Sequence, residues 1–494
     1  MKRLIKLLRL LDEHLLKLTL IGFLFAIPLY PKFPLFDLEY TYISIRADDV
    51  FVLILSTVYL IQLIRRKITF NKFLLLPIIL FWLAVFSSML YGFFFLKTIP
   101  VFNIGFLHAA RRVEYMVVFF IAASSVKSSK DVEHYLKAIF TSLFIVVLYG
   151  IGQKFFGLPA VQTMNPEFAR GHLLYLTPEA RVSSTFAGHY DLAAYLVFLI
   201  PLVFGFYYFR EKVRYFLLFV LSLFLLVLTA SRISFIAYIL SVFSLLIFIR
   251  KPKMIIIVAA LTAIFALTSQ NLTSRIFKTL QIKRIFVNEK TGQVVVPERI
   301  STKELPAGSF YITLKDQKSK VEEVDPEVLK QRILDEIREQ ATREGRLLTS
   351  SEEAAMVSTV SSQLKPVNTV VSDISFATRL QVEWPRAINA FLKSPIFGYG
   401  PSALTESTDN DYLRWIGELG LLGTLLFMYI LGMIIFKVWQ HFRNLKTKNK
   451  YVYIGFLFGV FGLLLNASYI DVFEASKVAY YFWIISGIIL SFAL

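Results

Sequence analysis

Long apolar runs, each of about 15 to 25 residues, recur along most of the chain and constrain its fold more than any other feature. Runs of this length match the roughly 30 Å hydrocarbon layer of a bilayer. Hydrophobic residues make up 56% of the 494 residues, more than one water-soluble core can hide. Because backbone polar groups in lipid must be satisfied within their own segment, these runs should be helices. The sequence therefore predicts an all-α polytopic membrane protein.

We expect about twelve membrane-spanning helices, about nine before residue 270 and about three after residue 411. Each predicted span is one apolar run bounded by polar or turn-forming residues. The expected spans are 17–32, 47–64, 73–96, 107–126, 134–153, 190–209, 214–230, 233–249, 254–269, 412–436, 451–468 and 475–493.

The net charge of +18 comes from basic residues that gather in short segments after alternate spans. Lys and Arg are enriched in cytoplasmic loops, so this pattern predicts a multi-pass protein with both termini in the cytoplasm. It also accounts for the positive charge without nucleic acid as a partner. The segments expected outside are 154–189, 231–232, 270–411 and 469–474.

The chain divides into three parts by composition. Residues 1–269 carry the N-terminal spans, residues 270–411 form a large extracytoplasmic loop, and residues 412–494 carry the C-terminal spans. Within the loop, residues 281–370 combine a strand-like stretch with a charged helix, which predicts a small inserted α/β subdomain with a structural or partner-binding role. Residues 376–392 repeat apolar side chains at helical spacing, so we expect an amphipathic helix on the membrane surface.

Charges beside the spans on one side are the first residues to consider for function, because charges near lipid are costly. Arginine binds phosphate oxygens in pairs and stays charged, which suits a diphosphate at a membrane surface. An arginine at a helix end is also a common interfacial anchor. Arg232 differs, because its very short hairpin predicts that the side chain points into the protein. The outer group comprises Arg46, Asp48, Asp49, Arg111, Arg112, Arg181, Asp191, Arg232, Arg379, Asp409, Asp411, Arg414 and Glu418.

Other chemistry finds little support in the sequence. There is no cysteine, which excludes disulfides and thiolate metal sites. The histidines lack metal-ligand spacing, and no phosphate-cradling GxxxxGK[ST] loop occurs. We therefore expect neither a metal site nor a cofactor.

Four stretches, in order, resemble the O-antigen ligase and O-antigen polymerase superfamily of bacterial envelope glycosyltransferases. The first is residues 181–196, which read RVSSTFAGHYDLAAYL before a Leu-Ile-Pro span. The second is Thr229-Ala-Ser-Arg232, and the third is Arg379 to Trp384 followed by Ser394 to Gly400. The fourth starts at Asp409-Asn-Asp-Tyr-Leu and continues to Gly423. Together they cover about residues 180 to 435.

The resemblance implies a GT-C-like fold and a metal-independent glycosyltransferase of the cytoplasmic (inner) membrane, with its active site on the extracytoplasmic side. The implied donor is a glycan on undecaprenyl diphosphate, so the partner is a lipid-linked oligosaccharide that also supplies the glycan acceptor. Arginines would hold the diphosphate as an acceptor hydroxyl attacks the anomeric carbon. A chain-length regulator and a flippase are partners that such an enzyme could use.

Transferred to this chain, the resemblance gives Asp409 and Arg232 catalytic roles. Asp409 would accept the acceptor's proton or orient the acceptor sugar; alternatively, Asp409 and Asn410 cap the helix that follows. The ligase branch carries a histidine at this place, so Asp409 favours repeat-unit polymerisation over transfer to lipid A-core or protein. A secondary transporter or a lipid-linked sugar flippase is the alternative from another class. The expected substrate-binding residues are Arg181, Arg379, Asn410, Tyr412, His189 and Arg112.

Overall fold

A computed structural model of the chain forms two compact units, Met1–Thr273 with Trp384–Leu494, and Ser274–Glu383. We refer to them as the helical unit and the second unit. The structure describes residues 12–37, 44–162, 172–177, 180–269, 272–273, 280–288, 294–295, 311–313, 331, 333–335, 337–338, 352–353, 357, 364–372, 379–404 and 408–491.

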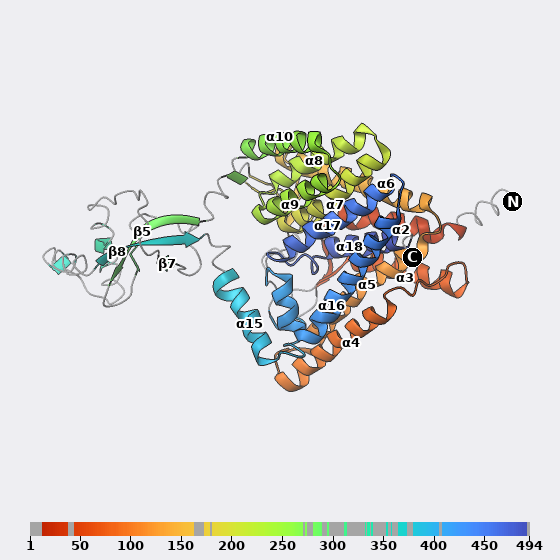
Figure 1. Ribbon diagram of the computed structural model, residues 1–494. Coiled ribbons are helices and arrows are strands. Elements are labelled where there is room, and N and C mark those ends of the chain that lie inside the picture. Colours follow the sequence, from red (N-terminus) through yellow and green to blue (C-terminus); the bar gives the residue numbers. More distant parts are fainter. Residues whose placement is uncertain are drawn as a thin grey trace. The chain divides into compact units, whose positions relative to one another are not determined.

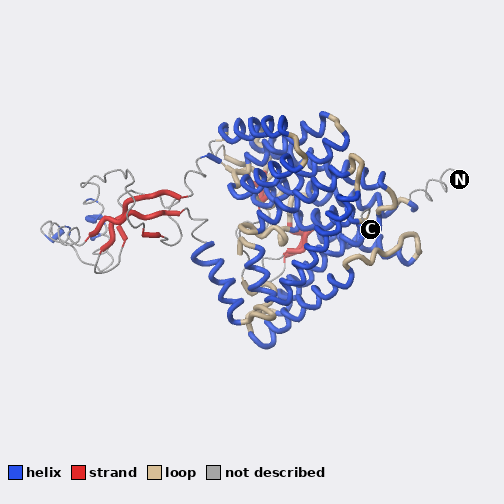
Figure 2. The backbone as a smooth tube through the Cα atoms, viewed as in Figure 1, coloured by secondary structure: helices blue, strands red, loops and turns tan. Residues whose placement is uncertain are grey.

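The helical unit is a bundle of long helices, and its described strands are short (Figures 1 and 2). Its helices are α2 (Leu15–Leu29), α3 (Ala47–Ile64), α4 (Leu75–Tyr91) with the π-helix η1 (Gly92–Leu96), α5 (Phe102–Ser125), α6 (Ser129–Phe155), α7 (His189–Arg210), α8 (Val213–Leu228), α9 (Arg232–Phe248), α10 (Pro252–Thr268), α15 (Trp384–Lys393), α16 (Asp411–Asn444), α17 (Lys450–Ala467) and α18 (Ser476–Leu490). Two small antiparallel pairs join β1 (Pro34–Asp37) to β2 (Ser44–Arg46) and β3 (Ala160–Gln162) to β4 (His172–Leu174).

These helices confirm that the chain is mostly helical and built from apolar segments. Among the described residues, six helices are long and apolar enough to cross a membrane: α3, α4 with η1, α6, α7, α16 and α17. Helices α2, α8, α9, α10 and α18 are apolar but shorter. Each of these eleven helices, and α5, overlaps one predicted span. The total of about twelve spans stays a prediction.

Polar contacts divide the helix ends into two sets, one at each end of the bundle. This division agrees with the prediction that successive spans run in opposite directions. At what we call the basic end, ion pairs join Lys17 to Asp131, Arg65 to Asp12, Arg210 to Glu133 and Lys448 to Glu211. At what we call the loop end, contacts join Lys477 to Tyr30 and Thr185, Arg112 to Glu474, Val182 to Leu228, and Asn410 to Ser468. Which end faces which side of a membrane stays a prediction.

Helix α7 forms the centre of the bundle, since every residue from Leu192 to Phe206 is buried. It packs closely on α17, where Gly205 and Gly459 permit the contact. A methyl group on Gly205 would lie 2.2 Å from the Tyr451 carbonyl oxygen, and one on Gly459 would lie 2.4 Å from that of Phe198. This packing fixes the end of α17, around which the loop end is built.

Helix α16 is broken at Gly420, which has a φ of 61° and a ψ of −165°. Residues 395–400 lie against the break and satisfy its backbone: Leu421 donates to the Pro395 carbonyl at 2.8 Å, and Gly400 donates to that of Glu418 at 2.9 Å. Inside a membrane protein, such a break is tolerated only where other protein groups replace the lost helical bonds. The break leaves a short half-helix, residues 411–419, that presents Arg414 and Glu418 at the loop end.

The second unit contains a four-stranded antiparallel sheet in the order β6-β5-β8-β7. Its strands are β5 (Leu280–Asn288), β6 (Val294–Val295), β7 (Tyr311–Thr313) and β8 (Leu364–Ser372), and the unit ends in the π-helix η3 (Arg379–Glu383). Most of the predicted charged helix lies outside the described residues. The predicted amphipathic helix corresponds, within the described part, to η3 and to α15, which belongs to the helical unit.

Candidate functional site

The segment that carries Arg181 is fixed against two helices of the bundle. Val182 donates a backbone hydrogen bond to the Leu228 carbonyl at 3.3 Å, at the end of α8. The Gln153 side chain on α6 accepts from the Ser184 backbone at 2.7 Å and donates back to its carbonyl at 2.8 Å. Arg181 itself contacts the His189 ring nitrogen at 2.5 Å. The structure thus brings together two of the predicted substrate-binding residues.

Arg232 is the first residue of α9 and follows the tight turn from α8. The turn is tied to the end of α17 through hydroxyl groups. Ser231 and Ser234 share a hydrogen bond of 2.8 Å, and the Ser234 hydroxyl donates to the Asn466 side chain at 3.0 Å. Arg232 is half-buried there, and the inward direction of its side chain stays a prediction.

Asn410 and Tyr412 reach the same end of α17 from the other side. The Asn410 side chain accepts from the Leu413 backbone at 3.1 Å, which confirms the predicted helix cap, and donates to the Ser468 carbonyl at 2.9 Å. The Tyr412 hydroxyl donates to the Leu464 carbonyl at 2.8 Å. Asp409 precedes this cap in the left-handed region, with a φ of 49°. The segments of Arg232 and Asp409 therefore converge on the last turn of α17.

Two carboxylates join the start of α16 to the loop between α17 and α18. Asp471 accepts backbone hydrogen bonds from Thr408, Asp409 and Asn410 at 2.9 to 3.1 Å. It also accepts from the Arg414 guanidinium at 2.9 Å. In return, Asp411 accepts from the backbone of residues 472 and 473 at 2.7 and 3.2 Å. The backbone of Asp409 is thus held by the carboxylate of Asp471.

Arg112 lies in a buried ion network rather than on an open surface. Its guanidinium donates to Glu418 at 2.5 Å and to Glu474 at 2.8 Å. Both Arg112 and Glu418 are buried. Burial alone would raise the pKa of Glu474, but the charges of Arg112 and Arg414 outweigh burial and lower this pKa to about 2. Two carboxylates thus already neutralise Arg112, whose contact with a substrate stays a prediction.

Lys477 is a buried cation that sequence reasoning missed. Its ammonium donates to the carbonyls of Pro28, Tyr30 and Thr185 at 3.1, 2.7 and 2.7 Å. All three donors are therefore used, and α18 is tied to α2 and to the Arg181 segment. A single lysine inside the predicted span 475–493 was the signal that could have identified it.

Three further charged residues also lay outside the sequence prediction. Asp471 and Glu474 occupy the short loop 469–474, where two acids stand next to predicted arginines. Lys32 is buried and follows α2 at the loop end. The remaining predicted residue, Arg379, begins η3 in the second unit and is buried there. Its role toward the substrate stays a prediction.

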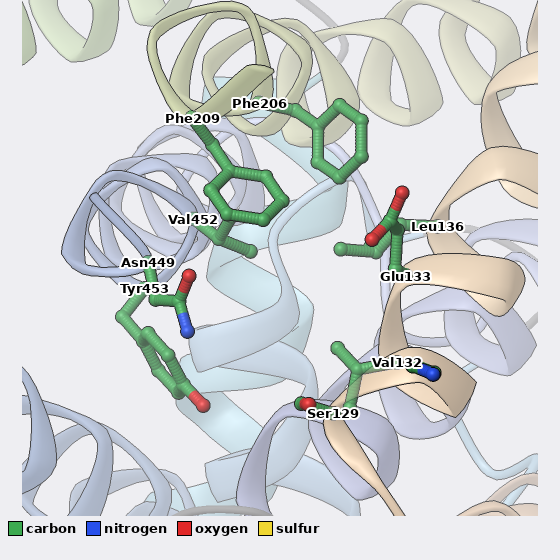
Figure 3. A pocket seen from close by; sticks show the side chains of 10 residues that line it. Ser129, Val132, Glu133, Leu136, Phe206, Phe209, Asn449, Val452 and Tyr453 are labelled. Atoms are coloured by element: carbon green, nitrogen blue, oxygen red, sulfur yellow. The ribbon is translucent and has the colours of Figure 1, made fainter. Parts of the chain in front are cut away.

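A separate hollow lies at the basic end, between the start of α6, the end of α7 and the start of α17 (Figure 3). Phe206, Phe209 and Val452 form its apolar side, and Glu133 and Asn449 lie at its polar side. None of the predicted site residues lines it. It is therefore a different place from the convergence around the end of α17.

The fold and the loop end define a helical membrane protein whose arginines and carboxylates gather around one helix end. Residues 353–428 match the family model described as O-antigen ligase. The match supports the O-antigen ligase and polymerase superfamily and an enzyme of that type, as the sequence motifs predicted. It runs from the second unit into α16 and includes Arg379, Asp409 and the break at Gly420. No curated protein matches the chain.

Proposed function

We propose that the chain is a glycosyltransferase that joins polyprenyl-diphosphate-linked oligosaccharide repeat units into surface polysaccharide on the outer face of the cytoplasmic membrane. The observation that carries the proposal is the convergence of the Arg181, Arg232 and Asp409 segments at the loop end. The match to the O-antigen ligase family supports an enzyme of the ligase or polymerase type. Neither the helical fold nor a single arginine would be enough, taken alone, to assign this function.

In the proposed reaction, an acceptor hydroxyl forms a bond to the donor's anomeric carbon while the bond from that carbon to the diphosphate oxygen breaks. The polyprenyl diphosphate leaves with the bonding electrons, and Arg181 and Arg232 stabilise its growing charge. These arginines supply the positive charge that a divalent cation provides in other phosphate sites, so the proposed transfer is metal-independent.

Asp409 receives the hydroxyl proton in this scheme. A general base must lie within hydrogen-bonding reach of the proton that it accepts. Asp409 has a positive φ, and its backbone N–H donates to the Asp471 carboxylate, so the backbone that carries the proposed base is held just before α16. His189, Asn410 and Tyr412 are proposed to contact the sugars, because they lie in the same segments as Arg181 and Asp409.

Transfer of a finished glycan to lipid A-core or to protein is the second candidate, and the family description favours it. Asp409 stands where the ligase branch carries a histidine, and this favours polymerisation. The two activities give different products from one substrate. A polymerase lengthens a lipid-linked glycan, whereas a ligase moves it unchanged to another acceptor.

The test uses purified full-length protein with a diphosphate-linked oligosaccharide, without added metal or nucleotide. A ladder of products spaced by one repeat unit is expected, and Arg232→Ala should abolish it while the protein stays folded and membrane-inserted. Arg443→Ala, an exposed arginine at the basic end, is the matched control and should leave the ladder unchanged. A single transfer to an added acceptor would identify a ligase. Movement of the lipid across the bilayer without any transfer would identify a flippase and refute the proposal.

A further inference from the structure

Lys32 and Arg46 are two cations at the loop end whose ammonium and guanidinium Nε groups have no hydrogen-bond partner among the described residues. Lys32 is only 6% exposed, yet its ammonium makes no hydrogen bond or ion pair in the part of the chain that the structure describes. The Nε atom of Arg46 is also buried without a hydrogen-bond partner. The β1–β2 pairing sets Arg46 opposite Pro34, and this brings the two cations to one side of the unit.

An unpaired buried ammonium is unfavourable, since burial removes water without providing a replacement. Lys477 shows the usual solution, with three carbonyls around its ammonium. Lys32 has no such set. Arg46 and Arg111 act on Lys32 as like charges, and Asp191 and Asp48 act on it as opposite charges. The fold therefore keeps a costly charge that its own packing does not use.

The carboxylates near these cations do not neutralise them directly. Among the described residues, neither Asp48 nor Asp191 forms an ion pair with Lys32 or Arg46. Asp48 instead accepts a hydrogen bond from the Ser476 hydroxyl at 3.2 Å. Four cations, Lys32, Arg46, Arg111 and Lys477, act on the Asp48 carboxylate. This concentration of positive charge suits an added anion.

The two cations are joined to the segment that carries Arg181. Lys477 donates both to Tyr30, two residues before Lys32, and to Thr185, four residues after Arg181. The Thr185 hydroxyl also donates to the Pro28 carbonyl at 2.5 Å. The segments that carry Lys32 and Arg181 therefore share one anchor, the Lys477 ammonium.

We propose that Lys32 and Arg46 form a second binding site for an oxyanion of the substrate, next to the Arg181 segment. The ligand is a phosphate oxygen of the lipid diphosphate or a carboxylate of an acidic sugar in the glycan. Both groups accept the strong charge-assisted hydrogen bonds that an ammonium and a guanidinium donate. The assignment rests on the proposed function, since it takes its ligand from that substrate.

The test measures binding of inorganic pyrophosphate and of glucuronate, by calorimetry, to the full-length protein in lipid nanodiscs. Lys32→Met removes the charge and keeps the side-chain length. It should weaken the binding affinity for one of the two anions by about tenfold or more. Arg46→Gln should weaken the same anion. Lys97→Gln is the matched control, because Lys97 is an exposed lysine at the loop end. The anion that is affected identifies the source of the ligand.

The unfolding temperature separates a binding role from a structural one. If Lys32 binds an anion, Lys32→Met should raise the unfolding temperature while it weakens binding, because an unpaired buried charge has been removed. If Lys32 only supports the fold, Lys32→Met should lower that temperature and leave anion binding unchanged. A lower unfolding temperature with unchanged anion binding would overturn the proposed site. Wild-type protein that binds neither anion would overturn it as well.

Ladder growth on the same preparations distinguishes the two proposals. Anion binding that depends on Lys32, together with no ladder from wild-type protein, would refute the proposed function and keep the site. A normal ladder together with binding that ignores both Lys32 and Arg46 would refute the site and keep the function.

Discussion

Asp411 and Asp471 cap each other's chain segments. The Asp471 carboxylate accepts from the backbone of residues 408 to 410, and the Asp411 carboxylate accepts from the backbone of residues 472 and 473. The first turn of α16 and the loop before α18 are thereby held as one body. Since Asp409 lies within the first segment, the pair sets the place of the proposed base.

Asp471→Asn tests this relationship. An amide has one acceptor oxygen in place of two, so it cannot accept from all three backbone groups and from Arg414. The loss of charge-assisted bonds should cost about 1.5 to 3 kcal/mol of stability. It should also reduce ladder growth, because the Asp409 backbone is no longer fixed. Thermal unfolding and product length on one preparation measure both effects.

Glu211→Gln is the control for Asp471→Asn, because it breaks an exposed ion pair with Lys448 at the basic end. Exposed pairs contribute about 0 to 1 kcal/mol, so this variant should match wild type in both measurements. A normal ladder from a stable Asp471→Asn protein would show that Asp471 does not position the base.

Arg112→Met tests whether Arg112 acts through its buried network. The change leaves the buried Glu418 and the partly buried Glu474 without their shared partner, which should cost about 3 to 5 kcal/mol. Adding Glu474→Gln should restore part of the lost stability, because one uncompensated charge disappears. Thermal unfolding of the single and double variants gives the answer. An unchanged unfolding temperature with lost activity would instead make Arg112 a substrate contact.

The dependence of stability on pH should reveal Glu474. Its pKa is about 2 in the folded protein, below the ordinary value of 4.5. A lowered pKa means that the ionised carboxylate stabilises the fold above pH 4.5, and that this contribution is lost as the pH falls from 4.5 toward 2. Wild type should therefore lose more stability than Glu474→Gln between pH 6 and pH 3. Parallel curves for the two proteins would contradict the ion network.

Hydropathy was sufficient to predict most of the helical unit, because lipid imposes one length and one secondary structure on a spanning segment. Each apolar helix of the bundle overlaps a predicted span. The predicted outer charges also included Asp411, Arg414 and Glu418, since charges at a span end are visible in the sequence. What such a pattern lacks is the partner of each charge. The structure pairs Arg112 with Glu418 and Glu474, partners that the sequence did not indicate, and its expected contact with a substrate stays a prediction.

Long-range pairing explains what the sequence left unpredicted. Asp471 acts on residues about sixty positions earlier, and Lys477 joins α18 to Tyr30 and Thr185, far away in the chain. No local spacing encodes such contacts. The break in α16 is a similar case, because the spacing of Gly417, Gly420 and Gly423 is equally typical of close helix packing. Gly420 instead leaves the helical conformation, and a distant segment satisfies its backbone.

Gly420→Ala adds only one methyl group, but it should lower both the stability of the protein and its activity. A methyl group there would lie 2.3 Å from the Ile396 carbonyl oxygen, and the φ of 61° is one that side chains rarely adopt. We expect a lower unfolding temperature and a lost ladder, because the half-helix that carries Arg414 and Glu418 would shift. Gly432→Ala in the same helix is the matched control, since nothing lies within 4 Å of its added methyl group. Gly432→Ala should be as stable as wild type or slightly more stable, whereas equal behaviour of the two variants would mean that the break does not matter.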